Sequence, residues 1–178
     1  MKFVALLRGI NVGKSVQVPM KELKTLFEEI GLRDVVTYLN SGNVLFESDL
    51  DSQGLTQTIG IALESRFSET IPVLVKTSSE IMNIRDAIPT EWKSDKFEQT
   101  YVAYLFREIA TPELVDELPI KRQYVEIKYA HEAIIWNIKR ENYNRSQITK
   151  IIAHPTYGRM TTRNVNTARK LALLCVSQ

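Results

Sequence analysis

The order in which strand-like and helix-like apolar patterns alternate is the feature that most constrains the fold of this chain. Residues 2–8 begin with a continuous apolar run, and residues 35–39 and 44–46 are rich in β-branched and aromatic side chains, as strands are. Apolar side chains recur at helical spacing over residues 20–30 and 55–67, and residues 71–75 again favour a strand. The order β-α-β-β-α-β predicts a ferredoxin-like lobe over residues 1–78.

A similar order returns in the second half of the chain. Strands are predicted at residues 101–106, 125–129 and 133–138, and helices at 112–118 and around 148–152, but no last strand is obvious. Residues 79–97 break the periodic pattern and favour a helical linker. We therefore expect an α+β protein with two ferredoxin-like lobes, at residues 1–78 and 98–178. The second lobe is expected to be incomplete and to end in a C-terminal helix.

Composition excludes several classes of protein. The hydrophobic and charged fractions, 44% and 25%, are those of an ordinary globular domain, and no apolar run is long enough to span a bilayer. A single cysteine, Cys175, excludes an intrachain disulfide and a cysteine-rich metal site. The two histidines have no suitably spaced carboxylate for a metal site. We expect a cytoplasmic protein with no metal, no cofactor and no membrane association.

The small net charge of +2 hides a strong asymmetry along the chain. Residues 1–26 carry five Lys or Arg and one acidic residue, whereas residues 27–138 carry ten basic and nineteen acidic residues. Residues 139–178 carry eight basic residues and one acidic residue. If the two ends meet in space, they form one positive surface that suits an anionic partner. Solvated helix faces would explain the same charges.

Three polar segments have a composition that suits an anion. They are residues 8–14 (RGINVGK), 40–43 (NSGN) and 161–166 (TTRNVN). Glycine permits close approach of the backbone to a ligand, and Arg, Asn and Thr supply hydrogen-bond donors. The candidate ligand-binding residues are Arg8, Asn11, Lys14, Asn40, Ser41, Asn43, Arg159, Thr162, Arg163 and Asn164. Each segment also has a purely structural explanation, as a glycine-bent connection, a hairpin turn and a helix cap.

The first of these segments nearly matches the phosphate-binding P-loop, but two features exclude that class. Three residues separate Gly9 from Gly13, where the P-loop has four. The next helix is predicted to begin at Pro19 rather than directly after Lys14. We therefore exclude an ATPase or GTPase of the P-loop type. The strand order of a ferredoxin-like lobe does not require this loop and the hairpin tip at residues 40–43 to adjoin.

Function is left open among three classes. The preferred hypothesis is a protein that binds a phosphate-bearing ligand, either a nucleotide-like metabolite or a nucleic-acid backbone. A second is an enzyme acting on a phosphorylated or carboxylated small molecule, with His154 or Tyr157 as the candidate for proton transfer. A third is a module that binds a protein partner. The sequence does not determine the oligomeric state.

The three polar segments and their surroundings resemble a bacterial family known only as domain of unknown function 1697. The resemblance rests on VALLRGINVG at residues 4–13, VPM at 18–20, YLNSGNV at 38–44 and MTTRNVNT at 160–167. Family members often have a second glycine where Lys14 stands and tryptophan where Val165 stands. The resemblance implies two ferredoxin-like lobes. It implies no activity, substrate or catalytic residue.

Overall fold

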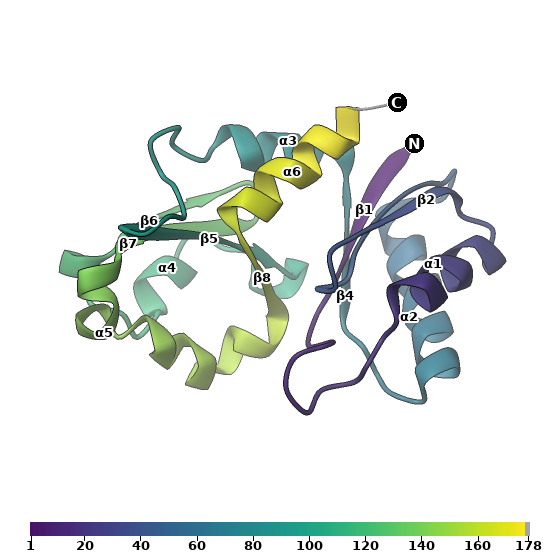
Figure 1. Ribbon diagram of the computed structural model, residues 1–178, viewed down its shortest axis with the longest axis horizontal. Coiled ribbons are helices and arrows are strands. Elements are labelled where there is room, and N and C mark those ends of the chain that lie inside the picture. The colour runs from purple at the N-terminus through teal and green to yellow at the C-terminus, as the bar shows by residue number, and fades with distance from the viewer. Residues whose placement is uncertain (177–178) are drawn as a thin grey trace. The chain divides into compact units, whose positions relative to one another are not determined.

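The computed structural model describes residues 1–176 and contains two four-stranded antiparallel sheets (Figure 1). Its contacts divide the chain into two units, which are described separately below. One unit is Met1–Ile81 together with the segment from Leu171 onward, and the other is Met82–Lys170. Helices α3 (Ser78–Asp86) and α6 (Val165–Val176) each cross the boundary. The order of elements in the sequence predicts instead that the segment from Leu171 belongs to the second lobe, residues 98–178.

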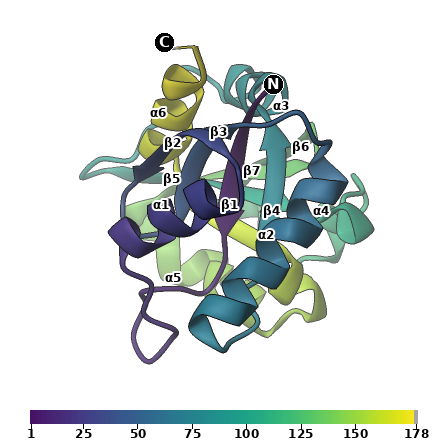
Figure 2. The same cartoon turned by 90° about the vertical axis from the view of Figure 1, so that its right-hand side faces the viewer.

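The first unit has the predicted ferredoxin-like topology. Its elements are β1 (Lys2–Leu7), α1 (Met20–Glu29), β2 (Arg33–Tyr38), β3 (Asn43–Glu47), α2 (Ser52–Phe67) and β4 (Val73–Thr77). The strand order in the sheet is β2-β3-β1-β4, with antiparallel neighbours throughout. Helices α1 and α2 cover the same face of the sheet (Figure 2).

The core of the first unit lies between this sheet face and the two helices. Alternate residues of β1, namely Phe3, Ala5 and Leu7, point into it because successive side chains of a strand lie on opposite faces. Helices α1 and α2 contribute Leu23, Leu26, Phe27, Leu55, Ile59 and Leu63. Val4 and Leu6, on the other face of β1, are also fully buried. Burial on both faces explains why the apolar run in β1 is continuous.

The second unit repeats the topology, and its sheet is complete. Its elements are β5 (Glu98–Leu105), α4 (Leu114–Glu117), β6 (Glu126–Ala130), β7 (Ala133–Lys139), α5 (Tyr143–Ser146) and β8 (Met160–Asn164), with 3-10 turns at Arg107–Ile109, Arg122–Tyr124, Arg140–Asn142, Ile148–Ala153 and Pro155–Arg159. The strand order is β6-β7-β5-β8. The core side of this sheet packs against α4 and the 3-10 turn at Ile148–Ala153.

The expectation of an incomplete second lobe is therefore wrong. The missing strand is β8, whose sequence MTTRN is polar and favours a loop and helix cap when read alone. β8 is an edge strand that pairs only with β5, from Tyr101↔Asn164 to Leu105↔Met160. The backbone supplies its ladder hydrogen bonds, so an edge strand does not need the apolar pattern on which the sequence analysis relied.

Candidate anion-binding site

The loop at residues 8–14 and the hairpin tip at residues 40–43 adjoin in the first unit. The Asn11 side chain connects them, because its Nδ2 donates to the carbonyl of Asn40 at 2.8 Å. The same Nδ2 donates to the carbonyl of Val18 at 2.9 Å, and Oδ1 accepts from the Val18 amide at 2.7 Å. Two of the three polar segments are thus brought together, although the strand order of a ferredoxin-like lobe does not by itself require this.

The backbone of the 8–14 loop is left-handed at alternate residues. The φ angles are +69° at Gly9, +55° at Asn11 and +54° at Gly13. Within the loop, the Asn11 amide donates to the Val16 carbonyl at 2.9 Å and the Val12 amide donates to Ser15 Oγ at 2.8 Å, so these bonds hold the loop in this conformation. Asparagine is among the non-glycine residues that best tolerate this conformation.

Positive charge in the 8–14 loop comes from Arg8 and Lys14. Arg8 is half-buried and its amide donates to the Pro72 carbonyl at 2.9 Å. Lys14 is exposed at the tip of a turn closed by the Ser15 amide and the Val12 carbonyl, 3.0 Å apart. No acidic residue precedes Glu22 in the sequence, and within residues 1–176 no carboxylate pairs with Lys14.

The polar side chains of the hairpin mainly build the hairpin itself. Asn43 is fully buried, and its Nδ2 donates to the Tyr38 carbonyl at 2.8 Å and to Ser41 Oγ at 3.0 Å. Asn40 is exposed, and its carbonyl accepts the bond from Asn11. The Leu7 amide donates to the carbonyl of Gly42, a residue with φ of +75°, at 2.8 Å. These bonds fix the hairpin tip against the end of β1.

The third polar segment lies in the second unit, where Arg163 is buried on β8. Its Nη1 donates to Thr161 Oγ1 at 2.9 Å and to the Thr162 carbonyl at 3.0 Å. Burial disfavours the charged form and lowers the pKa of Arg163 to about 10, an effect that Tyr104 partly opposes. Thr162 is half-buried in the same strand. Arg163 is therefore part of the interior of the structure rather than an exposed contact residue.

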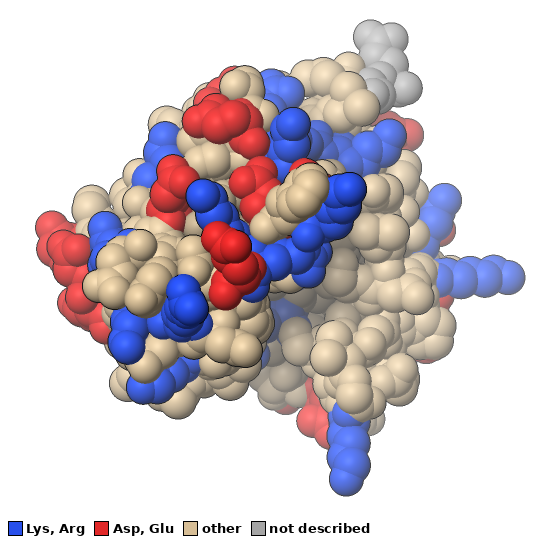
Figure 3. Space-filling view, turned by 60° about the vertical axis from the view of Figure 1, so that its left-hand side comes forward, with Lys and Arg blue, Asp and Glu red and all other residues tan. Residues whose placement is uncertain are grey.

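Asn164 ends β8 and caps α6. Its Oδ1 accepts from the Asn166 amide at 2.9 Å, and its Nδ2 donates to Ser94 Oγ at 2.7 Å. The first turn of α6 has no acidic residue, so the positive end of the helix dipole is not neutralised locally. Arg159 lies 3.3 Å from a carboxylate oxygen of Glu108. In the part of the second unit visible in Figure 3, basic side chains are interspersed with acidic ones.

The candidate groups for proton transfer have local structural partners. His154 Nδ1 lies 2.7 Å from Thr156 Oγ1, at the start of the 3-10 turn Pro155–Arg159, and Tyr157 is half-buried in that turn.

Burial raises the pKa of the Cys175 thiol to about 11, so it is protonated at neutral pH. Within residues 1–176 no group of three or more His, Cys, Asp or Glu side chains could hold a metal.

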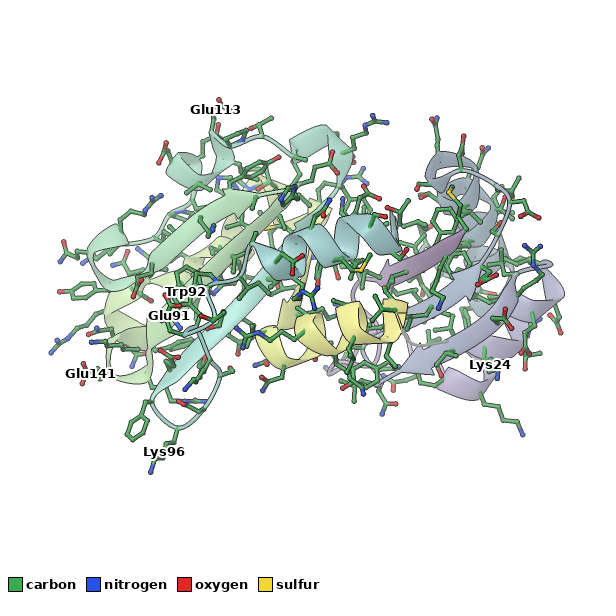
Figure 4. All side chains as sticks on the ribbon, turned by 90° about the horizontal axis from the view of Figure 1, so that it is seen from above. Lys24, Glu91, Trp92, Lys96, Glu113 and Glu141 are labelled. Atoms are coloured by element: carbon green, nitrogen blue, oxygen red, sulfur yellow. The ribbon has the colours of Figure 1, made fainter. Side chains whose placement is uncertain are left out.

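The first unit also contains a cavity that the sequence does not predict. It has a volume of about 750 Å³ and is lined by Lys2, Lys24, Glu28, Asp34, Val35, Val36, Leu45, Phe46, Glu47 and Leu174. Lys24 extends outward from α1 (Figure 4) and pairs with Glu28 at 3.7 Å. None of the three polar segments lines the cavity. No motif indicates it, because its residues come from separate elements and carry mixed charges.

No helix in residues 1–176 combines the length and apolarity needed to cross a membrane.

Comparison with known proteins identifies the family but no activity. The chain is similar to a solved structure, the conserved bacterial protein SP0830 from Streptococcus pneumoniae, with a TM-score of 0.85 and 22% sequence identity over 98% of each chain. That similarity shows a shared fold. No curated protein matches the chain. The family model "Protein of unknown function (DUF1697)" matches residues 1–136. The chain therefore belongs to the DUF1697 family of proteins of unknown function.

Proposed function

We propose that this protein binds a phosphate-bearing ligand at the 8–14 loop of its first unit. The observation that carries the proposal is a loop with a defined, alternately left-handed backbone whose exposed Lys14 pairs with no carboxylate within residues 1–176. Asn11 fixes this conformation from within through its bonds to Val18 and Asn40. A binding site of this kind needs no reorganisation before it accepts an anion.

The length of the connection supports a role beyond joining two elements. Residues 8–19 separate β1 from α1, whereas connections between a strand and a helix usually have about two to six residues. Longer ordered loops are commonly functional. The extra residues form the turn that carries Lys14, and the isolated Ile10↔Val16 bridge joins the two sides of this turn. The connection is thus an ordered structure with an exposed cationic tip.

Arg8 and Lys14 are the residues expected to contact the phosphate, because they supply the positive charge of the loop. Asn11, Asn43 and Gly42 would act by positioning, since their polar groups already hold the loop and hairpin. In the second unit, Arg159, Thr162 and Asn164 remain a separate proposal for a second anionic contact, which excludes Arg163 because that side chain is buried on β8. Its support is the uncompensated amino end of α6.

The test is a thermal-shift screen with inorganic phosphate, nucleotides, sugar phosphates and short single-stranded oligonucleotides. A ligand at about one hundred times its Kd adds about 2.7 kcal/mol to the stability of the folded state and raises Tm. We expect a shift from one of these classes. A steep loss of the shift with added salt would identify a nucleic-acid backbone, because many phosphates are then neutralised at once.

Lys14→Ala should abolish or strongly reduce that shift without changing the Tm of the ligand-free protein, because Lys14 is exposed. Lys21→Ala is the matched control, since Lys21 is also exposed but lies on α1 outside the loop. A shift that survives Lys14→Ala would move the site away from the loop. No shift from any compound would contradict phosphate binding and favour the protein-partner alternative. Turnover of a shifting compound would favour the enzyme alternative.

A further inference from the structure

Strand β6 forms one edge of the second sheet and carries an unusual combination of backbone and charge patterns. Within residues 1–176 it pairs with β7 alone, on one side. The two strands are joined by His131 and Glu132, whose φ angles of +50° and +59° define a two-residue turn of the type I′ class. This tight turn fixes the register of the hairpin and therefore the direction in which each backbone group of β6 points.

The backbone groups that face away from β7 belong to Ile127 and Tyr129. In a two-residue hairpin, the residues that flank the turn exchange both ladder hydrogen bonds, and here these are Ala130 and Ala133. Every second residue of β6 shares the orientation of Ala130, so Lys128 and Glu126 also bond inward. The N–H and C=O groups of the residues between them point outward, along the edge of the sheet.

The side chains of β6 divide its charges from its apolar groups. Glu126 and Lys128 are exposed and lie on the same face of the strand, whereas Ile127 and Tyr129 lie on the other face and pack partly against the core. Glu126 and Lys128 thus carry opposite charges two residues apart on an open edge. If a second copy of the strand lies beside it in the antiparallel direction, each of these charges can lie opposite a charge of the other sign.

We propose that β6 pairs with β6 of a second copy of this chain, in an antiparallel arrangement centred on Ile127. Ile127 would exchange two hydrogen bonds with Ile127 of the second copy. Two more bonds would run from each Tyr129 amide to the opposite copy's carbonyl of Val125, the residue that precedes β6 and shares its extended backbone. In this register each Glu126 lies directly opposite Lys128 of the second copy, in the closely spaced pairs between the hydrogen-bonded ones.

The charge pattern selects this register over its neighbours. Pairing centred on Glu126 places two carboxylates opposite each other, and pairing centred on Lys128 places two ammonium groups opposite each other. Registers displaced by one residue bring an outward-bonding residue opposite an inward-bonding one and break the ladder. A single short strand buries little area, so the dimer is weak and depends on protein concentration.

Charge reversal of the full-length protein tests the proposal by sedimentation velocity over a dilution series. The wild type should change from monomer to dimer as its concentration rises. Glu126→Lys alone and Lys128→Glu alone each place like charges opposite one another, and each should remain monomeric. The double variant E126K/K128E restores opposite pairs and should dimerise again. Lys150→Glu, an exposed reversal outside β6, should leave the wild-type behaviour unchanged.

A mixture of the two single variants tests the register most directly. Glu126→Lys leaves two lysines on this face of β6, and Lys128→Glu leaves two glutamates. The two variants should therefore form a dimer with each other, although neither variant forms a dimer with itself. Far-ultraviolet circular dichroism establishes that all variants are folded. A wild type that stays monomeric at every concentration overturns the proposal, and so does a dimer that neither single variant weakens. Mixed dimers in the expected pattern would establish both the strand and its register.

Discussion

At the scale of single residues, Gly42 holds the most constrained position in the candidate site. A Cβ at this position would lie 2.7 Å from Leu7 Cβ and 2.8 Å from Ile10 Cδ1, and the φ angle of +75° is one that L-residues rarely adopt. Both effects arise where the hairpin tip meets the end of β1. Replacement of Gly42 should therefore disturb the hairpin and the 8–14 loop together.

Gly42→Ala should destabilise the protein by about 1–3 kcal/mol or more, from overpacking combined with backbone strain. Gly60→Ala is the control, because Gly60 lies in α2 with open space where a Cβ would stand, and this variant should gain up to about 1 kcal/mol. Urea denaturation measures both as shifts of the midpoint at constant slope. An unchanged midpoint for Gly42→Ala would show that the hairpin adapts without cost.

Residue types alone could not separate ligand-binding from structural side chains. An asparagine amide serves a backbone carbonyl as well as it serves a phosphate. Asn11 and Asn43, both predicted as ligand donors, use their amides to fasten the loop and the hairpin. Arg163 is a candidate because of its charge, but its burial on β8 depends on long-range packing that no local pattern reveals. Lys14 is exposed, as its place in a polar loop suggests.

At the scale of elements, the sequence predicts those helices and strands whose own residues show a recognisable apolar pattern. The helices α1 and α2 and the buried strand β1 have such patterns, and the sequence predicts all three. It does not predict β8, whose side chains are polar, and it predicts a helix where residues 148–153 form a 3-10 turn. Ile148 and Ile151 are spaced three apart, which suits either kind of helix.

The junction of β8 and α6 depends on Asn164, which acts on two elements. Asn164→Ala should cost about 1 kcal/mol from loss of the cap, and further stability from loss of the bond to Ser94. Asn164→Asp keeps the capping oxygen but removes the donor to Ser94, so it should cost less than the alanine variant. Asn166→Ala, at an exposed position in the first turn, is the control. Equal losses for Asn164→Ala and Asn166→Ala in thermal denaturation would contradict the capping role.

At the scale of the whole molecule, the two units are not successive stretches of chain. The first unit includes the segment from Leu171 onward, although residues 82–170 form the second. The sequence predicts the two lobes from their repeated order of elements. It could not assign the end of α6 to the first unit, because an amphipathic helix shows that it has an apolar face and not what covers that face.

A chain that ends at Lys170 should be markedly less stable than the full chain. The removed segment contains the buried side chains Leu171, Ala172 and Cys175. Removal of one buried leucine side chain alone typically costs about 2–5 kcal/mol. A chain that ends at Val176 retains all three and is the control. The Tm values of the two truncated proteins, measured by calorimetry, should differ clearly, and equal values would show that the segment contributes nothing to stability.

This division of the chain also has a consequence for biosynthesis. A ribosome releases residues 1–81 first, then all of residues 82–170, and only afterwards the segment that belongs with the first unit. Domains usually fold as they emerge, beginning from the amino terminus. Here the first unit must wait for residues made after the second unit, so the second unit can acquire its complete set of strands before the first unit has all of its parts.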